Sequence, residues 1–210
     1  MVIFDLDGTL TDSADGVVAS FRFALSQIGA DVADRDLGPH LVGPPLRHTL
    51  IAMGLAAHAD AAVAAYRADY TARGWAMNRV YDGVESLLVD LRSAGVRLAV
   101  ATSKAESIAR RILTHFGLGR HFEVITGVVA DGPGEGKTEL LGQALQQLRP
   151  VPERVFMVGD RWHDVEAAMA HGLHPVVVGW GYGKTDFVDR SMAPVTYVST
   201  VDELRRVLGV

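Results

Sequence analysis

Two aspartates, Asp5 and Asp7, follow a short apolar run at residues 2–4. The β-prone residues before them predict a strand, and the Gly8-Thr9 pair predicts the turn that ends it. Residues two apart on a strand point to the same face, so the two carboxylates begin as neighbours. Two close carboxylates repel each other, and each would take up a proton unless a cation lay between them. A hard divalent cation with oxygen ligands, Mg²⁺ above all, would relieve this repulsion.

A second acidic pair, Asp160 and Asp164, follows another apolar run at residues 155–158. We expect this run to be a strand that delivers Asp160 to the same cation. Asp164 lies four residues further on, one helical turn away on the same side, where it can hold the cation or its water ligands. Aspartates are also common at the N-terminus of a helix for purely structural reasons. Two acidic motifs on two strands of one parallel sheet favour the metal site over that alternative.

The first acidic segment, Asp-Leu-Asp-Gly-Thr-Leu after an apolar strand, resembles the first motif of the haloacid dehalogenase (HAD) superfamily of phosphotransferases, in particular its phosphoglycolate-phosphatase-like members. The resemblance implies that Asp5 attacks phosphorus and becomes an aspartyl phosphate. It implies that Asp7 protonates the leaving group and then activates the incoming nucleophile. It also implies a Mg²⁺ site formed by Asp5, Asp7, Asp160 and Asp164, and a phosphate contact at Gly8.

Further polar positions match the remaining motifs of the family. Thr102 follows an apolar run at residues 97–101, where the family carries a Ser or Thr. The resemblance implies that its hydroxyl and the next backbone N–H, or Ser103, hold a phosphoryl oxygen, although such residues also cap helices. Lys137 matches the lysine that the family carries just before a helix, which would neutralise phosphoryl charge and pair with the nucleophile. Lys104 matches no motif and is expected to be a solvated charge.

The segment before Lys137 is rich in glycine, and the residue after it is Thr138 where relatives often have proline. The run narrowly misses the phosphate-binding loop pattern G-x-x-x-x-G-K-[ST], because Asp131 stands where the first glycine belongs. A carboxylate at that point would repel phosphate. We therefore interpret Lys137 as the lysine of the HAD motif.

These motifs specify phosphoryl transfer through Asp5 and leave the acceptor open. The chain resembles the HAD-fold protein tyrosine kinases of mycobacteria, which implies ATP as donor and a low-molecular-weight protein tyrosine phosphatase as partner. Tyr182 is then a candidate phosphoacceptor, because it lies between two glycines in a loop at the catalytic edge of the sheet. The alternatives are a phosphatase that acts on a small phosphate monoester of the phosphoglycolate or nucleotide type, and a non-catalytic binding module on a HAD scaffold.

The elements that must position these residues follow a simple order. From residue 80 onward, short apolar runs alternate with helical patterns, which predicts an α/β fold with a Rossmann-like parallel sheet covered on both faces. In such a sheet ligands bind beyond the carboxyl ends of the strands. Residues 15–78 read as helices only and resemble the small helical cap of many HAD enzymes. We therefore predict a core domain of residues 1–14 and 79–210 and a cap domain of residues 15–78.

Composition excludes several classes of protein. The chain has 210 residues, of which 49% are hydrophobic, enough for one full domain and a small insertion. A net charge of −5 without a long basic run makes nucleic acid a poor candidate partner. The absence of cysteine excludes a disulfide scaffold and fits a cytoplasmic location. No signal peptide or membrane-spanning run is present. The first strand begins at residue 2, so we expect a longer chain to precede it.

Overall fold

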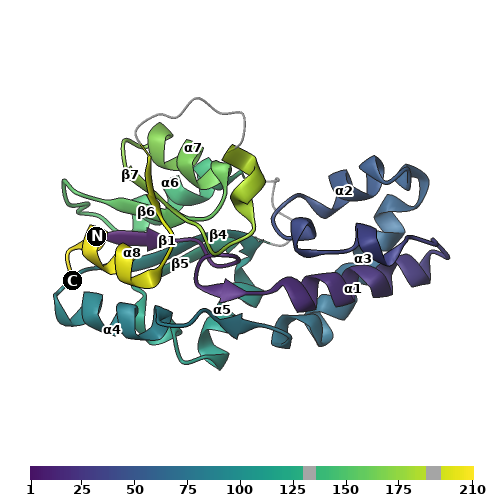
Figure 1. Cartoon of the computed structure of the whole chain (residues 1–210), viewed down its shortest axis with the longest axis horizontal. Helices are drawn as coiled ribbons and strands as arrows, with labels where there is room; N and C mark the ends of the chain where they lie inside the picture. The colour runs from purple at the N-terminus through teal and green to yellow at the C-terminus, as the bar shows by residue number, and fades with distance from the viewer. Residues whose placement is uncertain (130–135, 188–194) are drawn as a thin grey trace. The chain divides into compact units, whose positions relative to one another are not determined.

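The computed structural model describes residues 1–129, 136–187 and 195–210. Within these residues the chain divides into two compact units (Figure 1). The first unit contains Met1–Thr11 and Val80–Val210, and the second contains Asp12–Arg79. All of the candidate catalytic residues belong to the first unit. The interpretation of the helical unit as a cap stays a prediction.

The first unit is built on a six-stranded sheet in the order β5-β4-β1-β6-β7-β8, and its neighbouring strands are parallel. Its strands are β1 (Val2–Phe4), β4 (Leu98–Ala105), β5 (Val124–Val128), β6 (Phe156–Gly159), β7 (His174–Val178) and β8 (Thr196–Val198). Parallel strands are buried on both faces, which explains why the central strands read as almost continuous apolar runs. The prediction of an α/β fold with a Rossmann-like parallel sheet is confirmed.

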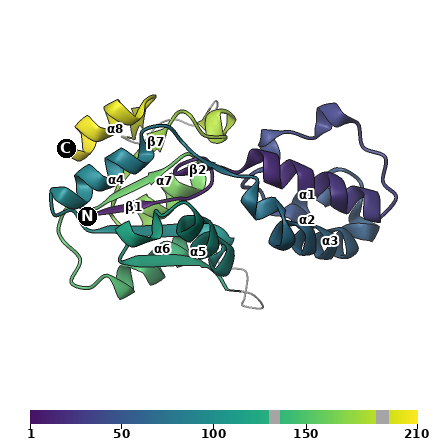
Figure 2. The same ribbon diagram turned by 90° about the horizontal axis from the view of Figure 1, so that it is seen from below.

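Helices cover this sheet. The α-helices described in the first unit are α4 (Val84–Ser93), α5 (Glu106–His115), α6 (Lys137–Gln147), α7 (Trp162–Ala170) and α8 (Val201–Leu208). Helices α6 and α7 pack on one face, where Leu141 and Ala168 join Ile3 and Met157 in a buried apolar cluster. Helices α4 and α8 lie together across the sheet from α6 (Figures 1 and 2). The strands that carry the candidate site are therefore held from both sides.

Strand β4 is longer than the sequence analysis predicted. The apolar run was expected to end at Ala101, whereas the strand continues to Ala105. Between these two residues its register against β5 shifts, as in a β-bulge. Bulges are common beside active sites because they redirect side chains. Here the shift falls on the segment that contains Thr102 and Lys104.

The second unit consists mainly of helices. These are α1 (Ala14–Gln27), α2 (Leu46–Ala52) and α3 (Ala59–Ala72), with short 3-10 turns between them. Helix α1 packs on α3. Two short strands, β2 (Thr11–Asp12) and β3 (Arg79–Val80), pair with each other and contain both points where the chain passes between the units. Asp12 and Arg79 also form an ion pair at 2.5 Å.

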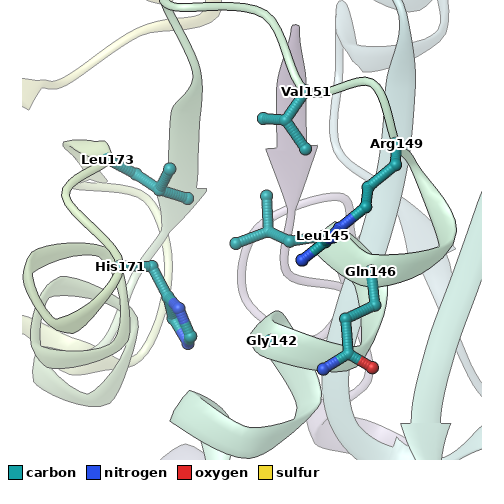
Figure 3. A pocket seen from close by; sticks show the side chains of 7 residues that line it. All are labelled: Gly142, Leu145, Gln146, Arg149, Val151, His171 and Leu173. Carbon is teal, nitrogen blue, oxygen red and sulfur yellow. The ribbon is translucent and has the colours of Figure 1, made fainter.

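A surface pocket of about 280 Å³ opens beside the C-terminal part of α6 and the end of α7 (Figure 3). Its lining includes Leu145, Arg149 and His171 and none of the candidate catalytic residues. In a parallel α/β sheet the helices run back against the strands, so this pocket belongs to the edge opposite the strand carboxyl ends. Within the described ranges, none of the helices has the length and apolar character needed to cross a membrane.

Candidate active site

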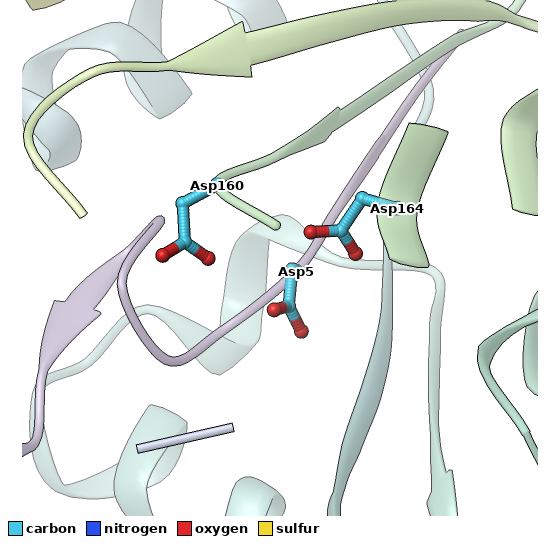
Figure 4. Close-up of side chains that lie close together, drawn as sticks. All are labelled: Asp5, Asp160 and Asp164. Atoms are coloured by element: carbon cyan, nitrogen blue, oxygen red, sulfur yellow. The ribbon is translucent and has the colours of Figure 1, made fainter. Parts of the chain in front are cut away.

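Three carboxylates meet at the carboxyl edge of the sheet. Asp5 follows β1, Asp160 follows β6, and Asp164 lies in the first turn of α7 (Figure 4). One ligand oxygen from each side chain lies within 4.8 Å of the others. Strands β1 and β6 are direct neighbours, with Phe4 opposite Val158, so the residues that follow them lie side by side. All three aspartates are buried, with 8%, 1% and 3% of their surface exposed in that order.

Lys137, the first residue of α6, bridges two of these carboxylates. Its Nζ lies 2.7 Å from Oδ1 of Asp5 and 2.8 Å from Oδ1 of Asp164. Burial alone would lower the pKa of Lys137, but the attraction of Asp164 and Asp5 outweighs it and raises this pKa above its usual value. Lys137 therefore carries its charge at neutral pH and neutralises part of the acidic cluster.

The pKa values of two of the aspartates are shifted upward. Burial raises the pKa of Asp5 to about 6, an effect that Lys137 opposes and that Asp164 and Asp7 reinforce. Burial raises the pKa of Asp160 to about 8, and the charges of Asp164 and Asp5 add to the effect. Carboxyl groups in this state gain from a nearby cation, because a cation stabilises their ionised forms.

Asp160 shows how the cluster fits a cation. Its Oδ2 accepts hydrogen bonds from the backbone N–H of Tyr182 at 2.7 Å and of Gly183 at 3.2 Å. Its Oδ1 is buried and has no hydrogen-bond partner among the described residues. An oxygen buried without a donor is costly, whereas carboxylate oxygens are the ligands that Mg²⁺ prefers. The residues present therefore fit a hard divalent cation.

The loop after β7 packs closely around Asp160. A Cβ atom at position 183 would collide with the carbonyl oxygen of Asp160, so this close approach requires glycine. Nearby, Nε1 of Trp180 donates to the carbonyl oxygen of Thr9 at 3.1 Å. We predicted that Tyr182 lies in a loop between two glycines, and the backbone of this loop is held against Asp160. We did not predict these contacts, because they are made mainly by backbone N–H groups.

Arg161 and Asp186 form an ion pair at 3.1 Å that joins the end of this loop to the residue after Asp160. Arg161 also donates its backbone N–H to Oδ2 of Asp164 at 3.0 Å, which fixes the first turn of α7. These two contacts hold the loop, Asp160 and Asp164 in one arrangement. Little in the sequence indicates this ion pair, because Arg161 and Asp186 are far apart in the chain and their opposite charges alone do not show that they pair.

Asp7 does not belong to the group of three carboxylates. Its Oδ2 lies 2.8 Å from Nζ of Lys104, and the Lys104 side chain is only 9% exposed. The expectation that Lys104 is a solvated charge is therefore wrong. The apolar run was expected to end at Ala101, and the register shift between Ala101 and Ala105 interrupts the regular alternation of side chains, so strand periodicity did not indicate the placement of Lys104.

The remaining predicted site residues, Thr102, Ser103 and Gly8, differ in how they relate to the acidic cluster. Thr102 is buried, and its Oγ1 accepts the backbone N–H of Lys104 at 3.3 Å. Val100 lies opposite Phe4 in the sheet, so Thr102 reaches the same edge as Asp5. Ser103 is exposed, and no described contact joins its side chain to the acidic cluster. Gly8 has a φ of +81° and packs against the Asp160 carboxylate.

The glycine-rich approach to Lys137 is described only in part. Residues 131–135, which carry the near match to a phosphate-binding loop, lie outside the described residues. Gly136 and Lys137 are described, with Gly136 preceding the first residue of α6. Lys137 contacts Asp5, the residue with which the HAD resemblance pairs it, and also Asp164, a contact that we did not predict. The catalytic roles of these residues stay predictions.

Known proteins share this architecture. A family model described as haloacid dehalogenase-like hydrolase matches residues 2–178. The chain is 63% identical to the tyrosine-protein kinase PtkA of Mycobacterium tuberculosis, over 100% of this chain and 72% of that protein. It is 39% identical to a 5'-nucleotidase of Pseudomonas aeruginosa, over 99% of this chain and 94% of that protein. The crystal structure of a predicted phosphatase from Clostridium acetobutylicum superposes with a TM-score of 0.87 at 34% identity, covering 99% of this chain and 96% of that one. The predicted relationship is thereby confirmed, and the chain belongs to the haloacid dehalogenase-like hydrolase family.

Proposed function

We propose that this chain is a Mg²⁺-dependent phosphotransferase in which Asp5 takes the phosphoryl group from its donor. The observation that carries this proposal is the setting of Asp5. Its carboxylate lies beyond a central strand, within 4.8 Å of ligand oxygens of Asp160 and Asp164 and 2.7 Å from the ammonium group of Lys137. A nucleophilic carboxylate needs a cation on one side and a positive group for the phosphoryl oxygens on the other.

Each residue then has a role. Asp5, Asp160 and the backbone carbonyl of Asp7 would hold Mg²⁺, and Asp164 would hold the ion or its water ligands. When bound, Mg²⁺ would offset the negative charge of the phosphoryl group. Lys137 would neutralise the phosphoryl oxygens from the other side. The Thr102 hydroxyl, with backbone N–H groups near Ser103 and Gly8, would hold the oxygens in place.

We infer that a tyrosine hydroxyl is the acceptor and ATP the donor. The support is the 63% identity to a protein named tyrosine-protein kinase, over the full length of this chain. A low-molecular-weight protein tyrosine phosphatase is the proposed protein partner, and Tyr182 the proposed site of self-modification. Both follow from resemblance and from the place of Tyr182 beside Asp160.

A phosphatase is the second candidate function. It is favoured by the 5'-nucleotidase relative, which is 39% identical and covered over 94% of its length, and by the similar predicted phosphatase structure. Transfer to water would use the same nucleophile, the same cation and the same lysine. The substrate would then be a small phosphate monoester.

One experiment separates these functions. The protein is incubated with Mg²⁺ and ATP, with and without a low-molecular-weight tyrosine phosphatase, and in parallel with a panel of phosphate monoesters. Phosphotyrosine would support the kinase, and free phosphate from the monoesters would support the phosphatase. If neither product forms, both enzymatic functions are contradicted and a non-catalytic binding module is favoured. The Asp5→Asn variant is the control for contaminating activity.

We also propose that the second unit, Asp12–Arg79, is the cap of this enzyme. It is an insertion made mainly of helices between β1 and the rest of the sheet, and its two ends join the first unit through the paired strands β2 and β3. Relaxation measurements with and without a phosphate analogue would test this. Different rotational correlation times for the two units would support a mobile cap, and a single rigid body under every condition would contradict it.

A further inference from the structure

The ion pair between Lys104 and Asp7 stands apart from the cluster that the proposed mechanism uses. The Lys104 Nζ lies 2.8 Å from Oδ2 of Asp7, and 9% of the Lys104 side chain and 17% of the Asp7 side chain are exposed. Burying a lysine side chain to this extent is costly unless its ammonium group is paired with an opposite charge. A flexible surface lysine would gain little from such a pair. The placement of Lys104 therefore calls for a specific explanation.

The local fold delivers Lys104 to Asp7. The register of β4 shifts between Ala101 and Ala105, and within this shift the backbone N–H of Lys104 donates to Oγ1 of Thr102. On the neighbouring strand, a Cβ at position 127 would lie 2.6 Å from the carbonyl oxygen of Lys104, so glycine leaves the room that the shifted segment occupies. Lys104 is thus held by its backbone as well as by its charge.

The two carboxylate oxygens of Asp7 have different contacts. Oδ2 is anchored by Lys104, whereas Oδ1 is buried and has no hydrogen-bond partner among the described residues. The same division occurs at Asp160, where one oxygen is anchored by backbone N–H groups and the other has no described partner. An aspartate side chain that follows a strand could otherwise rotate toward the cation. Because Lys104 holds Oδ2 of Asp7, Oδ1 is the oxygen that can exchange a proton with a substrate.

We propose that Lys104 is a positioning residue that holds the carboxyl group of Asp7 where its Oδ1 reaches the leaving-group oxygen. This inference depends on the phosphotransferase function proposed above. In the first step an oxygen of Asp5 bonds to phosphorus, and the bond from phosphorus to the leaving oxygen breaks with its electron pair going to that oxygen. Asp7 takes part in this step as the neutral acid, in which Oδ2 accepts a hydrogen bond from the Lys104 ammonium group and Oδ1 carries the proton. That proton moves to the same leaving oxygen. A general acid must lie within hydrogen-bond reach of the atom that it protonates, which is what the anchor provides.

The test compares two donors in the variant Lys104→Met. Acetyl phosphate releases a carboxylate, which departs without a proton. An alkyl phosphate monoester releases an alkoxide oxygen, which needs one. Total phosphoryl transfer, as phosphoprotein plus free phosphate, is measured with each. We expect transfer from the monoester to fall on the order of 10²-fold, the usual contribution of a positioned general acid, and transfer from acetyl phosphate to fall much less.

Two further variants and one binding measurement complete the test. Lys184→Met makes the same chemical change at an exposed lysine of the first unit and should leave both donors unaffected. Lys104→Arg keeps a positive charge and should restore part of the lost transfer; it also serves if Lys104→Met fails to fold. Mg²⁺ affinity, followed by amide chemical shifts, should be unchanged in both Lys104 variants.

The outcomes distinguish the positioning role of Lys104 from the phosphotransferase function itself. Equal losses with both donors, or a loss of Mg²⁺ affinity that matches the loss of transfer, would overturn the positioning role and leave the phosphotransferase function standing. A wild-type chain that transfers phosphate from no donor would overturn the proposed function and this inference with it. A wild-type chain that uses ATP or acetyl phosphate but no alkyl monoester would overturn this inference alone, because neither leaving group needs a proton. A loss confined to the monoester supports both.

Discussion

The backbone N–H of Tyr182 donates to Oδ2 of Asp160 at 2.7 Å, although the two residues lie on separate loops. This single bond connects the proposed phosphoacceptor to a proposed metal ligand. Gly183 adds a second bond to the same oxygen at 3.2 Å. The loop therefore sets the orientation of Asp160 through its backbone, so changes in this backbone should reach the metal site.

The variant Gly183→Ala should weaken Mg²⁺ binding by roughly 10- to 100-fold, the usual effect of losing a group that orients a metal ligand. The added Cβ would collide with the carbonyl oxygen of Asp160 and displace the loop. An Mg²⁺ titration followed by amide shifts near residues 5–9 and 159–164 measures the affinity. Gly119→Ala is the control, because the atoms nearest to its missing Cβ lie 3.8 Å away and its φ is not positive. Equal affinity in Gly183→Ala and wild type would contradict the role of the loop.

Asp5→Asn should lower phosphoryl transfer by more than about 10⁴-fold, as expected when a catalytic nucleophile is removed. The amide is close in size to the carboxylate and can still accept a hydrogen bond from Lys137, so the fold should persist. Steady-state transfer assays give the first result, and circular dichroism with amide spectra gives the second. Turnover near the wild-type rate would show that Asp5 is not the nucleophile.

Lys137→Met should lower the free energy of unfolding of the metal-free protein by about 3 kcal/mol, because it leaves two buried carboxylates without their ammonium partner. These are Asp5 and Asp164, at 2.7 Å and 2.8 Å from Nζ. Urea denaturation measures the change. Lys184→Met removes an exposed ammonium group and should change stability by less than about 0.5 kcal/mol. Similar losses in the two variants would argue against the buried pairing.

The metal-free protein should become less stable as pH rises from about 4 to about 8. The pKa values of Asp5 and Asp160 are raised from 3.8 to about 6 and about 8, mainly by burial. Within this range the folded state holds protons that the unfolded state has released, so the slope of unfolding free energy against pH is negative. The charged groups that influence these carboxyls are Lys137, Asp7, Asp164 and Arg161.

Denaturation at several pH values, with and without Mg²⁺, checks this expectation. A bound cation favours the ionised carboxylates, so Mg²⁺ should reduce the loss of stability at the upper end of the range. The Asp160→Asn variant should lose the part of the slope between about pH 6 and pH 8. Stability that rises with pH in the metal-free wild type would contradict the raised pKa values.

Tyr182 should carry phosphate after incubation with ATP and Mg²⁺ if the acceptor is a tyrosine. Its backbone lies against Asp160, its side chain is partly exposed, and Tyr70 by contrast is buried in α3. Mass spectrometry identifies the modified residue. The modification should disappear in Asp5→Asn, and total phosphotyrosine should fall in Tyr182→Phe. Unchanged phosphotyrosine in Tyr182→Phe would assign the acceptor elsewhere.

The sequence was informative wherever a local pattern decides the structure. The predicted alternation of strands and helices continues to the end of the chain, where β8 (Thr196–Val198) is followed by α8 (Val201–Leu208). Local residue types define both elements: a β-prone triplet forms the strand, and the Thr200 hydroxyl caps the helix by accepting the N–H of Glu203. The two acidic motifs were placed for the same reason, since each directly follows an apolar strand.

The features that were missed depend on contacts between distant segments. Lys104 was dismissed because we ended its strand at residue 101, and the register shift against β5 has no signature in either strand alone. The hydrogen bonds from the Tyr182 loop to Asp160 involve backbone N–H groups, which every residue except proline possesses. Residue type therefore carries almost no information about them.

Strands β2 and β3 pair, so the chain leaves and re-enters the first unit at neighbouring points. Paired strands keep their backbones about 4.8 Å apart. A segment inserted between such points can be lengthened, shortened or exchanged with little effect on the register of the sheet. The catalytic sheet and the helical insertion are in this sense separable modules. Under the proposed function, residues 12–79 are the part of the chain that could be replaced to reach a new substrate while Asp5, Asp160 and Asp164 keep their arrangement.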